Sequence, residues 1–314
     1  MAKEPNAPLA AAIASCVTGC APNAVKRFTT GARHHVFDIG FQGRPPVVVR
    51  IGDPSARAEM EGAVYLSGLL RPRGVPLPAI LAANVHAECP WLVLERLPGT
   101  DLGAIIAGVS DTQLDRIAAG VAQAQAITAQ TGTAGRYGYA VRPERAPQST
   151  WSQVLDAHLA RSRRRIASTG LFDAGLVDRV QRHLSIMRDR IDAVAPTPFL
   201  HDTTTRNVIV TPEGAFSGIV DVDDLCFGDP RHPVALTMAV LMAHGGPVGY
   251  VKAWLGHAGR KEDRMFWFYV SAFLLDLMSE HGQAFNGNDY PSTPEARRSL
   301  RLAFEACMAR ILHS

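Results

Sequence analysis

Two short apolar runs within residues 199–230 restrict the fold of this 314-residue chain more than any other feature. Val208–Val210 and Gly218–Val220 are rich in β-branched residues, and a Pro-Glu-Gly turn signal separates them. The pattern predicts a β-hairpin. Because the first strand of a hairpin begins where the second one ends, we expect Asn207 and Asp221 at the same end of it.

A third polar residue, Asp202, precedes this hairpin by a few positions. Two carboxylates and one amide form an oxygen-rich set, which suits Mg²⁺ and the phosphates it accompanies. An Asp, an Asn five residues later and a strand that ends in Asp are typical of kinase-type phosphotransfer sites. In such sites the first Asp orients the acceptor hydroxyl, and the Asn and the second Asp hold metal on the nucleotide.

This stretch resembles the aminoglycoside phosphotransferase family, which has a protein-kinase-like fold. The His-x-Asp-x-x-x-x-Asn motif of that family corresponds to Leu200–Asn207, its Ile-Asp to Val220-Asp221 and its Gly-Asp to Gly228-Asp229. One position departs from the motif, because the histidine, His201, is adjacent to the aspartate and Leu200 stands in its usual place. The spacing from aspartate to asparagine is intact.

The resemblance extends from about Val25 to Glu280 and is most specific at Asp202–Pro230. A weaker similarity to hygromycin-type phosphotransferases rests on Gly135-x-Tyr137-Gly138 followed by Thr150-Trp151. The implied fold class is α+β and bilobed. A small N-terminal antiparallel sheet lobe with one main helix is expected over residues 1–97, and a mostly helical lobe with the catalytic loop and the acceptor site over 98–314.

In the first lobe, Val25–Phe41 predicts two strands around a turn that contains Gly31. The resemblance implies that this turn covers the nucleotide phosphates, although it has one glycine where a glycine-rich loop has several. Val47–Ile51 predicts a buried strand that carries a cation, Arg50, and a buried cation needs a partner.

By the resemblance, Arg50 replaces the lysine that binds nucleotide phosphates and pairs with a glutamate of the following helix, predicted over Ser55–Leu70. Glu61 is the expected partner, and Glu59 is the alternative because the sequence does not fix the register of this helix. Its apolar face is expected to include Val64, Leu66 and Leu69.

A further strand, Pro90–Leu97, ends at Pro98-Gly99, which supplies a bend. By the resemblance this is the connection between the lobes, where the main chain near Glu95–Leu97 reads the purine edge. Beyond it the apolar spacing becomes helical. It predicts helices over 112–130, 149–168, 176–194, 232–243, 251–255, 262–280 and 293–312.

Asp276 and Glu280 share one face at the end of the helix predicted over 262–280, because they are four residues apart. The resemblance implies that acidic residues of this region line an acceptor cleft, and a solvated helix end is the alternative. Asp223 is either a further metal or substrate contact or a carboxylate satisfied within a polar loop.

Composition excludes several classes of function. A net charge of +3 is too small for a nucleic-acid binder, and no apolar run is long enough to cross a membrane. Five cysteines without a disulfide spacing favour free thiols and a cytoplasmic location. The Ala-rich segment before Cys16 lacks the positive charge of a signal peptide and is expected to form a short helix. The chain is expected to be a monomer or a homodimer.

The predicted function is Mg²⁺-dependent transfer of the γ-phosphate of ATP or GTP to a hydroxyl of a small molecule, an aminoglycoside-type or other antibiotic. A sugar or amino-alcohol acceptor is the alternative. A catalytically silent kinase-like binding protein and a metal-dependent phosphohydrolase, the latter suggested by His201-Asp202, are readings from other classes. The candidate residues are Asp202 for catalysis, Asn207 and Asp221 for metal, Arg50, Glu61, Gly31, Glu95 and Leu97 for the nucleotide, and Asp223, Asp276 and Glu280 for the acceptor.

Overall fold

The computed structural model describes residues 5–29, 34–285, 288–289 and 292–313. The chain divides into two compact units. Unit 1 comprises Met1–Pro98, Gly218–Asp224 and Ala284–Asp289, and unit 2 comprises Gly99–Ser217, Leu225–Gln283 and Tyr290–Ser314. The assignment of nucleotide binding to residues 1–97 and of acceptor binding to 98–314 stays a prediction.

Unit 1 is built on a five-stranded sheet with the strand order β1-β2-β3-β5-β4, in which neighbouring strands are antiparallel. Its strands are β1 (Ala24–Arg27), β2 (His35–Phe41), β3 (Arg44–Ile51), β4 (Ile80–Asn84) and β5 (Trp91–Glu95). Its helices are α1 (Ala7–Thr18) and α2 (Arg57–Leu70), with single 3-10 turns at Pro54–Ala56 and Arg71–Arg73. A short strand pair, β12 (Ala284–Phe285) and β13 (Asn288–Asp289), completes the unit.

The two helices pack on sheet side chains that alternate along each strand. Val49 and Val93 belong to the apolar cluster that includes α1, whereas Leu92 packs with Met60 of α2. Since successive side chains of a strand point to opposite faces, Arg50, which pairs in register with Leu92, shares the face that carries α2. The alternation of side chains in β3 therefore determines on which face of the sheet its buried cation lies.

Helix α2 differs in detail from the prediction. It begins at Arg57 after the 3-10 turn, whose first amide is capped by Asp53, rather than at Ser55. Leu66 is buried as predicted, but Val64 is 38% exposed and Leu69 only half-buried. The buried positions are Met60, Gly62, Ala63, Leu66 and Leu70. The buried face of α2 thus includes the small residues Gly62 and Ala63, whereas the prediction considered only large apolar side chains.

Unit 2 holds eight helices and six short strands among its described residues. The helices are α3 (Leu102–Ile105), α4 (Asp111–Thr128), α5 (Trp151–Thr169), α6 (Leu176–Asp192), α7 (His232–His244), α8 (Gly249–His257), α9 (Arg264–Glu280) and α10 (Pro294–His313), with 3-10 turns at Ile106–Gly108 and Pro143–Arg145. The strands are β6 (Thr100–Asp101), β7 (Gly138–Ala140), β8 (Thr197–Phe199), β9 (Val208–Val210), β10 (Phe216–Ile219, which continues into unit 1) and β11 (Leu225–Gly228).

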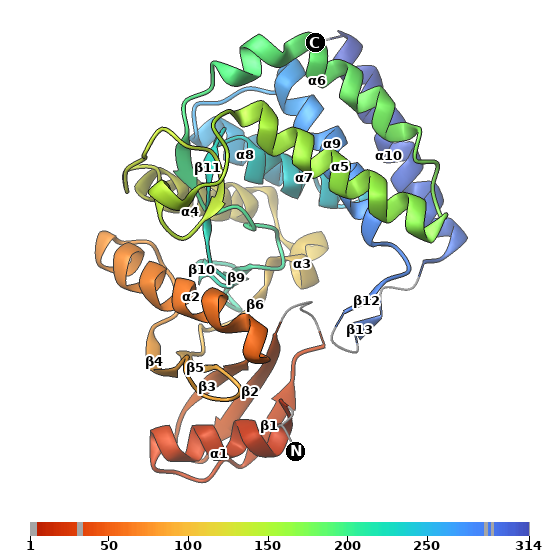
Figure 1. Cartoon of the computed structure of the whole chain (residues 1–314). Helices are drawn as coiled ribbons and strands as arrows, with labels where there is room; N and C mark the ends of the chain where they lie inside the picture. The colour runs from red at the N-terminus through yellow and green to blue at the C-terminus, as the bar shows by residue number, and fades with distance from the viewer. Residues whose placement is uncertain (1–4, 30–33, 286–287, 290–291, 314) are drawn as a thin grey trace. The chain divides into compact units, whose positions relative to one another are not determined.

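Helix α9 is the centre of this unit, since α5, α6, α7 and α10 all pack against it (Figure 1). Its residues Phe266, Phe268 and Tyr269 are fully buried. Helices α4 and α5 each begin with a capping box, formed by Ser110 with Gln113 in α4 and by an equivalent Thr-Gln pair in α5.

The predicted hairpin is confirmed: β9 and β10 are neighbours in a three-stranded sheet with β6, and the Thr211 N–H donates to the Ala215 carbonyl across their turn. The strand β11 was not predicted. It is buried along its whole length and pairs with β7 and β8, so that the Cys226 thiol lies in a strand instead of a loop. All five cysteines are free. No helix in the described part of the chain is long and apolar enough to cross a membrane.

Candidate active site

The loop that carries Asp202 is held to unit 2 by one side chain of α4. The Gln125 side chain accepts a hydrogen bond from the Leu200 N–H at 3.0 Å and donates to the Leu200 carbonyl at 2.8 Å and to Thr203 Oγ1 at 2.9 Å. Leu200 and Thr203 are both buried. These contacts immobilise the main chain on both sides of Asp202.

The end of the same loop closes on its beginning. Asn207 Nδ2 donates to the main-chain carbonyl of Asp202 at 2.9 Å, and the Asn207 N–H donates to the Thr204 carbonyl. From α7, Thr237 donates its hydroxyl proton to the Thr203 carbonyl at 3.1 Å. Because Asn207 uses its amide nitrogen here, its side-chain oxygen is the atom that suits a cation.

The displaced histidine of the motif has an aromatic neighbour. The His201 ring meets the Tyr139 ring edge to face, with centroids 5.0 Å apart. Leu200, at the usual histidine position, is an apolar anchor that is 2% exposed. The Gln125 side chain, through its hydrogen bonds to the main chain of Leu200, therefore fixes the loop at the position where the family motif has a histidine.

In unit 1, Arg50 is 5% exposed and its main partner is Asp223. Its Nη1 donates to Asp223 Oδ1 at 2.7 Å and its Nη2 donates to Asp223 Oδ2, while Nη2 also lies 3.2 Å from Asp221 Oδ1. Glu61, the predicted partner, is exposed on α2, and the carboxylates that contact Arg50 in the described part of the chain are those of Asp221 and Asp223. Glu59, the alternative, has its Oε2 3.7 Å from the Nε2 of His34.

These contacts determine the charge of Asp223. Burial alone would raise the pKa of its carboxyl, but the hydrogen bond with His34 and the charge of Arg50 outweigh burial and lower the pKa to about 2. The pKa of Arg50 is raised: burial opposes its charge, and the carboxylates of Asp221 and Asp223 more than compensate. Asp223 is thus a counter-ion of Arg50 in this structure, as in the alternative of a satisfied carboxylate, and a role in substrate binding stays a prediction.

Asp221 has the features of an available oxygen ligand. It follows β10 with a φ of 65°, the one positive φ outside glycine among the described residues, and half of its side chain is exposed. Within the described ranges, no three His, Cys, Asp or Glu residues cluster as a metal cage. A site with one or two protein oxygens fits Mg²⁺, which keeps several waters and takes phosphate oxygens as its remaining ligands.

Two further nucleotide candidates, Glu95 and Leu97, lie at or beside the end of β5. Glu95 is exposed, its N–H donates to the Ala79 carbonyl, and its carboxylate accepts from the Ala79 N–H at 3.0 Å. Leu97 is buried, and its carbonyl accepts from Arg96 Nη1 at 2.8 Å. Gly31 lies outside the described residues. The roles of these residues in binding a nucleotide stay predictions.

The two acidic candidates of α9 differ from each other. Asp276 is mostly buried and accepts from Arg161 Nη2 at 3.0 and 3.1 Å and from Ser162 at 3.3 Å. Its pKa is lowered, since burial is outweighed by the neighbouring His158 and Arg161. The Glu280 side chain is 41% exposed, and burial followed by the charge of Asp276 raises its pKa to about 7. Asp276 is therefore already neutralised by a residue that the sequence did not indicate.

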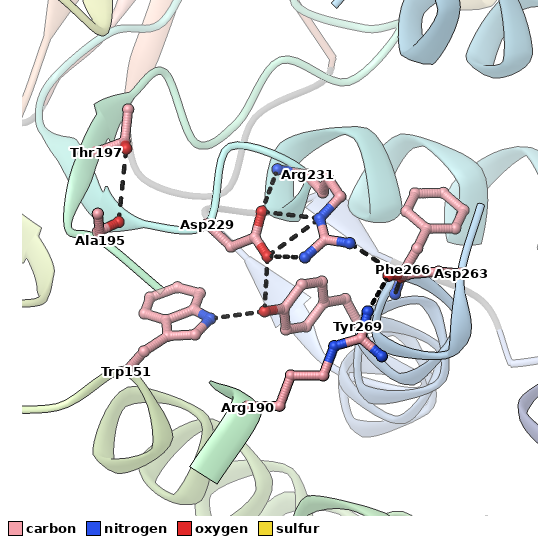
Figure 2. A network of polar contacts seen from close by, with 9 residues as sticks. All are labelled: Trp151, Arg190, Ala195, Thr197, Asp229, Arg231, Asp263, Phe266 and Tyr269. Carbon is pink, nitrogen blue, oxygen red and sulfur yellow. Dashed lines mark hydrogen bonds and ion pairs between the residues drawn. The ribbon is translucent and has the colours of Figure 1, made fainter. Parts of the chain in front are cut away.

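The Gly-Asp-Pro segment after β11 anchors helices (Figure 2). Asp229 accepts hydrogen bonds from Arg231 and, at 3.0 Å, from the Tyr269 hydroxyl, which in turn accepts from Trp151 Nε1 at 2.9 Å. Arg231 continues to Asp263, the N-cap of α9. The start of α7 is thereby tied to α5 and α9.

His232, the next residue, is 1% exposed and has no hydrogen-bond partner for either ring nitrogen within the described chain. Its pKa lies well below the usual value because it is buried and because His158 is close. It packs as an uncharged ring against Phe273 and other aromatic residues.

Comparison with known proteins gives one family and one fold. The sequence profile described as "Phosphotransferase enzyme family" matches residues 24–267. No curated protein has a detectably similar sequence. Similar solved structures include aminoglycoside phosphotransferase APH(4)-Ia in a ternary complex with AMP-PNP and hygromycin B, which is 14% identical with a TM-score of 0.65 over 96% of this chain and 97% of that one.

Two further structures share this fold. A candidate fructosamine-3-kinase from Thermobifida fusca is 18% identical, with a TM-score of 0.62 over 97% of this chain and 98% of that one. The GDP complex of a variant of aminoglycoside 2'-phosphotransferase-IIIa is 15% identical, with a TM-score of 0.64 over 98% and 95% of the two chains. The predicted α+β kinase-like fold is confirmed. At these identities the likeness concerns the fold and leaves the acceptor open.

Proposed function

The chain belongs to the phosphotransferase enzyme family, and from this premise we propose that it transfers the γ-phosphate of ATP or GTP to a hydroxyl group of a small molecule, with Mg²⁺. The observation that carries the proposal is the hydrogen bond from Asn207 to the Asp202 carbonyl. It joins the residue assigned to the metal with the residue assigned to the acceptor in one closed loop.

In the proposed reaction, Asp202 orients the acceptor hydroxyl. The acceptor oxygen forms a bond to the γ-phosphorus, the bond from that phosphorus to the β,γ-bridging oxygen breaks, and a nucleoside diphosphate leaves. The hydroxyl proton passes to the Asp202 carboxylate late in the step. Because the transition state is loose, positioning and charge neutralisation provide most of the rate enhancement.

We assign the side-chain oxygens of Asn207 and Asp221 to the metal. When bound, Mg²⁺ neutralises charge on the phosphate oxygens. Arg50 is a positioning residue in this proposal, since its contact with Asp221 at 3.2 Å orients that carboxylate and its bidentate pairing with Asp223 fixes the guanidinium itself. This replaces the sequence-based role of Arg50 as a partner of Glu61.

Thermal stabilisation by nucleotide tests the first half of the proposal. The Tm of the full chain is measured with Mg²⁺ and ATP or GTP for the wild type, for Asp221→Ala and for Asp189→Ala, a control at an exposed site on α6. A ligand at one hundred times its Kd stabilises by about 2.7 kcal/mol. The wild type and the control should show this rise in Tm, and Asp221→Ala should lose it. A wild type that responds to neither nucleotide would contradict the proposal.

Turnover with a panel of hydroxylated acceptors tests the second half. Asp202→Ala should abolish phosphoryl transfer and keep the nucleotide-dependent rise in Tm, because Asp202 is assigned to the acceptor. Nucleotide binding without transfer to any acceptor would favour a silent binding protein. Metal-dependent release of phosphate that needs no acceptor would favour a phosphohydrolase.

A further inference from the structure

Helices α5 and α9 of unit 2 pack against each other (Figure 1). Four charged side chains pair between these two helices. Arg161 and Arg165 come from α5, and Asp276 and Glu280 come from the end of α9. Each guanidinium faces one carboxylate: Arg161 Nη2 is 3.0 Å from Asp276, and Arg165 Nη1 is 3.9 Å from Glu280. The two acidic residues therefore do not form an acidic surface on their own.

This group borders the loop that carries Asp202. The charge of Asp202 contributes to the raised pKa of Glu280, and the Tyr139 hydroxyl acts on the pKa of Arg161. Tyr139 is 37% exposed, and its ring meets His201, the neighbour of Asp202 in the chain. The ring contact and these two electrostatic effects place Tyr139, Glu280 and Arg161 in the same neighbourhood of unit 2 as the loop that carries Asp202.

The carboxylate of Asp276 has little capacity to bind a further cation, because its oxygens already accept hydrogen bonds. Its two oxygens accept from Arg161, one of them also accepts from Ser162, and His158 Nε2 lies 3.4 Å away. An ammonium group of a ligand would have to displace a guanidinium that is held at two oxygens. Such charge-assisted pairs are among the strongest hydrogen bonds in proteins.

The charges of the group follow from these contacts. Arg161 and Arg165 carry two positive charges at neutral pH, and Asp276 carries one negative charge. Glu280, with a pKa of about 7, is near half-ionised. The sum for these four side chains is close to zero or slightly positive. The neighbouring Asp202 carboxylate adds one negative charge, whereas a site for a polycation needs a larger excess of negative charge.

We propose that Arg161 determines the charge of the acceptor, and that the natural acceptor is a neutral or acidic polyhydroxyl compound of the sugar or sugar-acid class, without several ammonium groups. Arg161 acts in two ways: it occupies Asp276, and its own charge repels a cation. Rejection by an unfavourable charge is a common basis of specificity. The inference rests on the proposed function, since it concerns the acceptor of that reaction.

Equilibrium binding of hygromycin B, an aminoglycoside with amino groups that are protonated at neutral pH, tests the inference. The full-length wild type is compared with Arg161→Gln, which removes the charge and releases Asp276. The control is Arg163→Gln, two residues away on α5, where the arginine pairs with Asp178 instead. We expect Arg161→Gln to bind hygromycin B at least about tenfold more tightly than the wild type and the control to match the wild type.

Two additional measurements separate charge from other effects. Arg161→Lys keeps the charge and should bind hygromycin B as weakly as the wild type, and the gain in Arg161→Gln should shrink at high salt because ions screen exposed charges. D-gluconate, an acidic polyol, should bind the wild type more tightly than it binds Arg161→Gln. Circular dichroism confirms that each variant is folded.

Equal affinities of the wild type and Arg161→Gln for hygromycin B, including no binding by either, would overturn the inference. This outcome is distinct from a failure of the proposed function. The latter appears as the absence of a rise in Tm with Mg²⁺ and nucleotide in the wild type, which is measured on the same samples.

Discussion

Asn207 Nδ2 donates a hydrogen bond of 2.9 Å to the main-chain carbonyl of Asp202, five residues earlier in the chain. The amide side chain of Asn207 thus has two polar atoms with different roles. The nitrogen closes the loop, and the oxygen is assigned to the metal. Any change at this residue should therefore affect both the position of Asp202 and the binding of nucleotide, and the two effects can be separated.

Asn207→Asp and Asn207→Ala should separate them. A carboxylate keeps an oxygen for the metal but cannot donate to the Asp202 carbonyl. Asn207→Asp should therefore retain a rise in Tm with MgATP. Its kcat should fall by about tenfold or more, because one hydrogen bond that positions Asp202 is lost. Asn207→Ala should lose both. Equal kcat values for Asn207→Asp and the wild type would show that closure of the loop is irrelevant to turnover.

Removal of Arg50 should destabilise unit 1. Arg50→Met leaves the Asp223 carboxylate, whose side chain is 20% exposed, without its main partner, and the loss of one partner of a buried pair costs about 3–5 kcal/mol as an upper bound. Adding Asp223→Asn should restore part of that loss, because the unpaired charge disappears. Chemical denaturation of both variants measures the effect, with Arg73→Met, at an exposed position, as the control. A single variant as stable as that control would contradict the pairing.

The same pair predicts a dependence of stability on acid pH. The pKa of Asp223 is about 2 in the folded protein and 3.8 in its reference state, so the unfolded chain takes up a proton first. The contribution of ionised Asp223 to the free energy of unfolding is present above about pH 4 and is lost as the pH falls towards 2. It amounts to about 2 kcal/mol at most. Asp223→Asn should show a correspondingly shallower loss of Tm between pH 4 and 2.

Glu280 should give stability the opposite dependence on pH from Asp223. Its pKa in the folded protein, about 7, is above the reference value of 4.5, so the folded state holds the proton more tightly. The stabilisation is present below pH 4.5 and is lost as the pH rises through 7. The Tm of the wild type should thus fall relative to that of Glu280→Gln between pH 5 and 8. Arg165→Gln should move this window to higher pH, because it removes a charge that favours the ionised form.

Gly99 should tolerate no side chain. Its φ is 110°, and a Cβ added there would lie 1.9 Å from the Val210 carbonyl oxygen of β9. Gly99→Ala should lower the free energy of unfolding by more than about 1 kcal/mol, through strain and collision together. Gly108→Ala is the matched control, since its added Cβ has no atom within 4 Å and its φ is not positive. A similar stability of both variants would refute this account.

Features with local causes were predictable from the sequence. Neighbouring residues determine the turn between β9 and β10 and the helical spacing of α4, α6 and α9. The structure has these elements within a few positions of the prediction. The fold class followed from these elements together with the resemblance. The contacts within the loop, from Asn207 to the Asp202 carbonyl, span only five residues.

Contacts between distant segments were not predictable in the same way. The partner of Arg50 is 173 residues away, and the neighbouring helix offered two glutamates that local reasoning preferred. Arg161 meets Asp276 only because α5 packs on α9, and in the sequence it is the first of a run of arginines that resembles a solvated face. Strand β11 was not predicted, because its four residues are all buried and show no alternation of polar and apolar side chains.

The separation between Arg50 and Asp223 has a consequence for biosynthesis. A ribosome adds about 5–20 residues per second, so Asp223 is made roughly 10–30 s after Arg50. During that interval the first 98 residues have emerged with a cation that the finished sheet buries and without the carboxylates that neutralise it. The nascent N-terminal segment therefore cannot reach its final state alone, and a fragment that stops at Pro98 should depend on chaperones or remain unfolded.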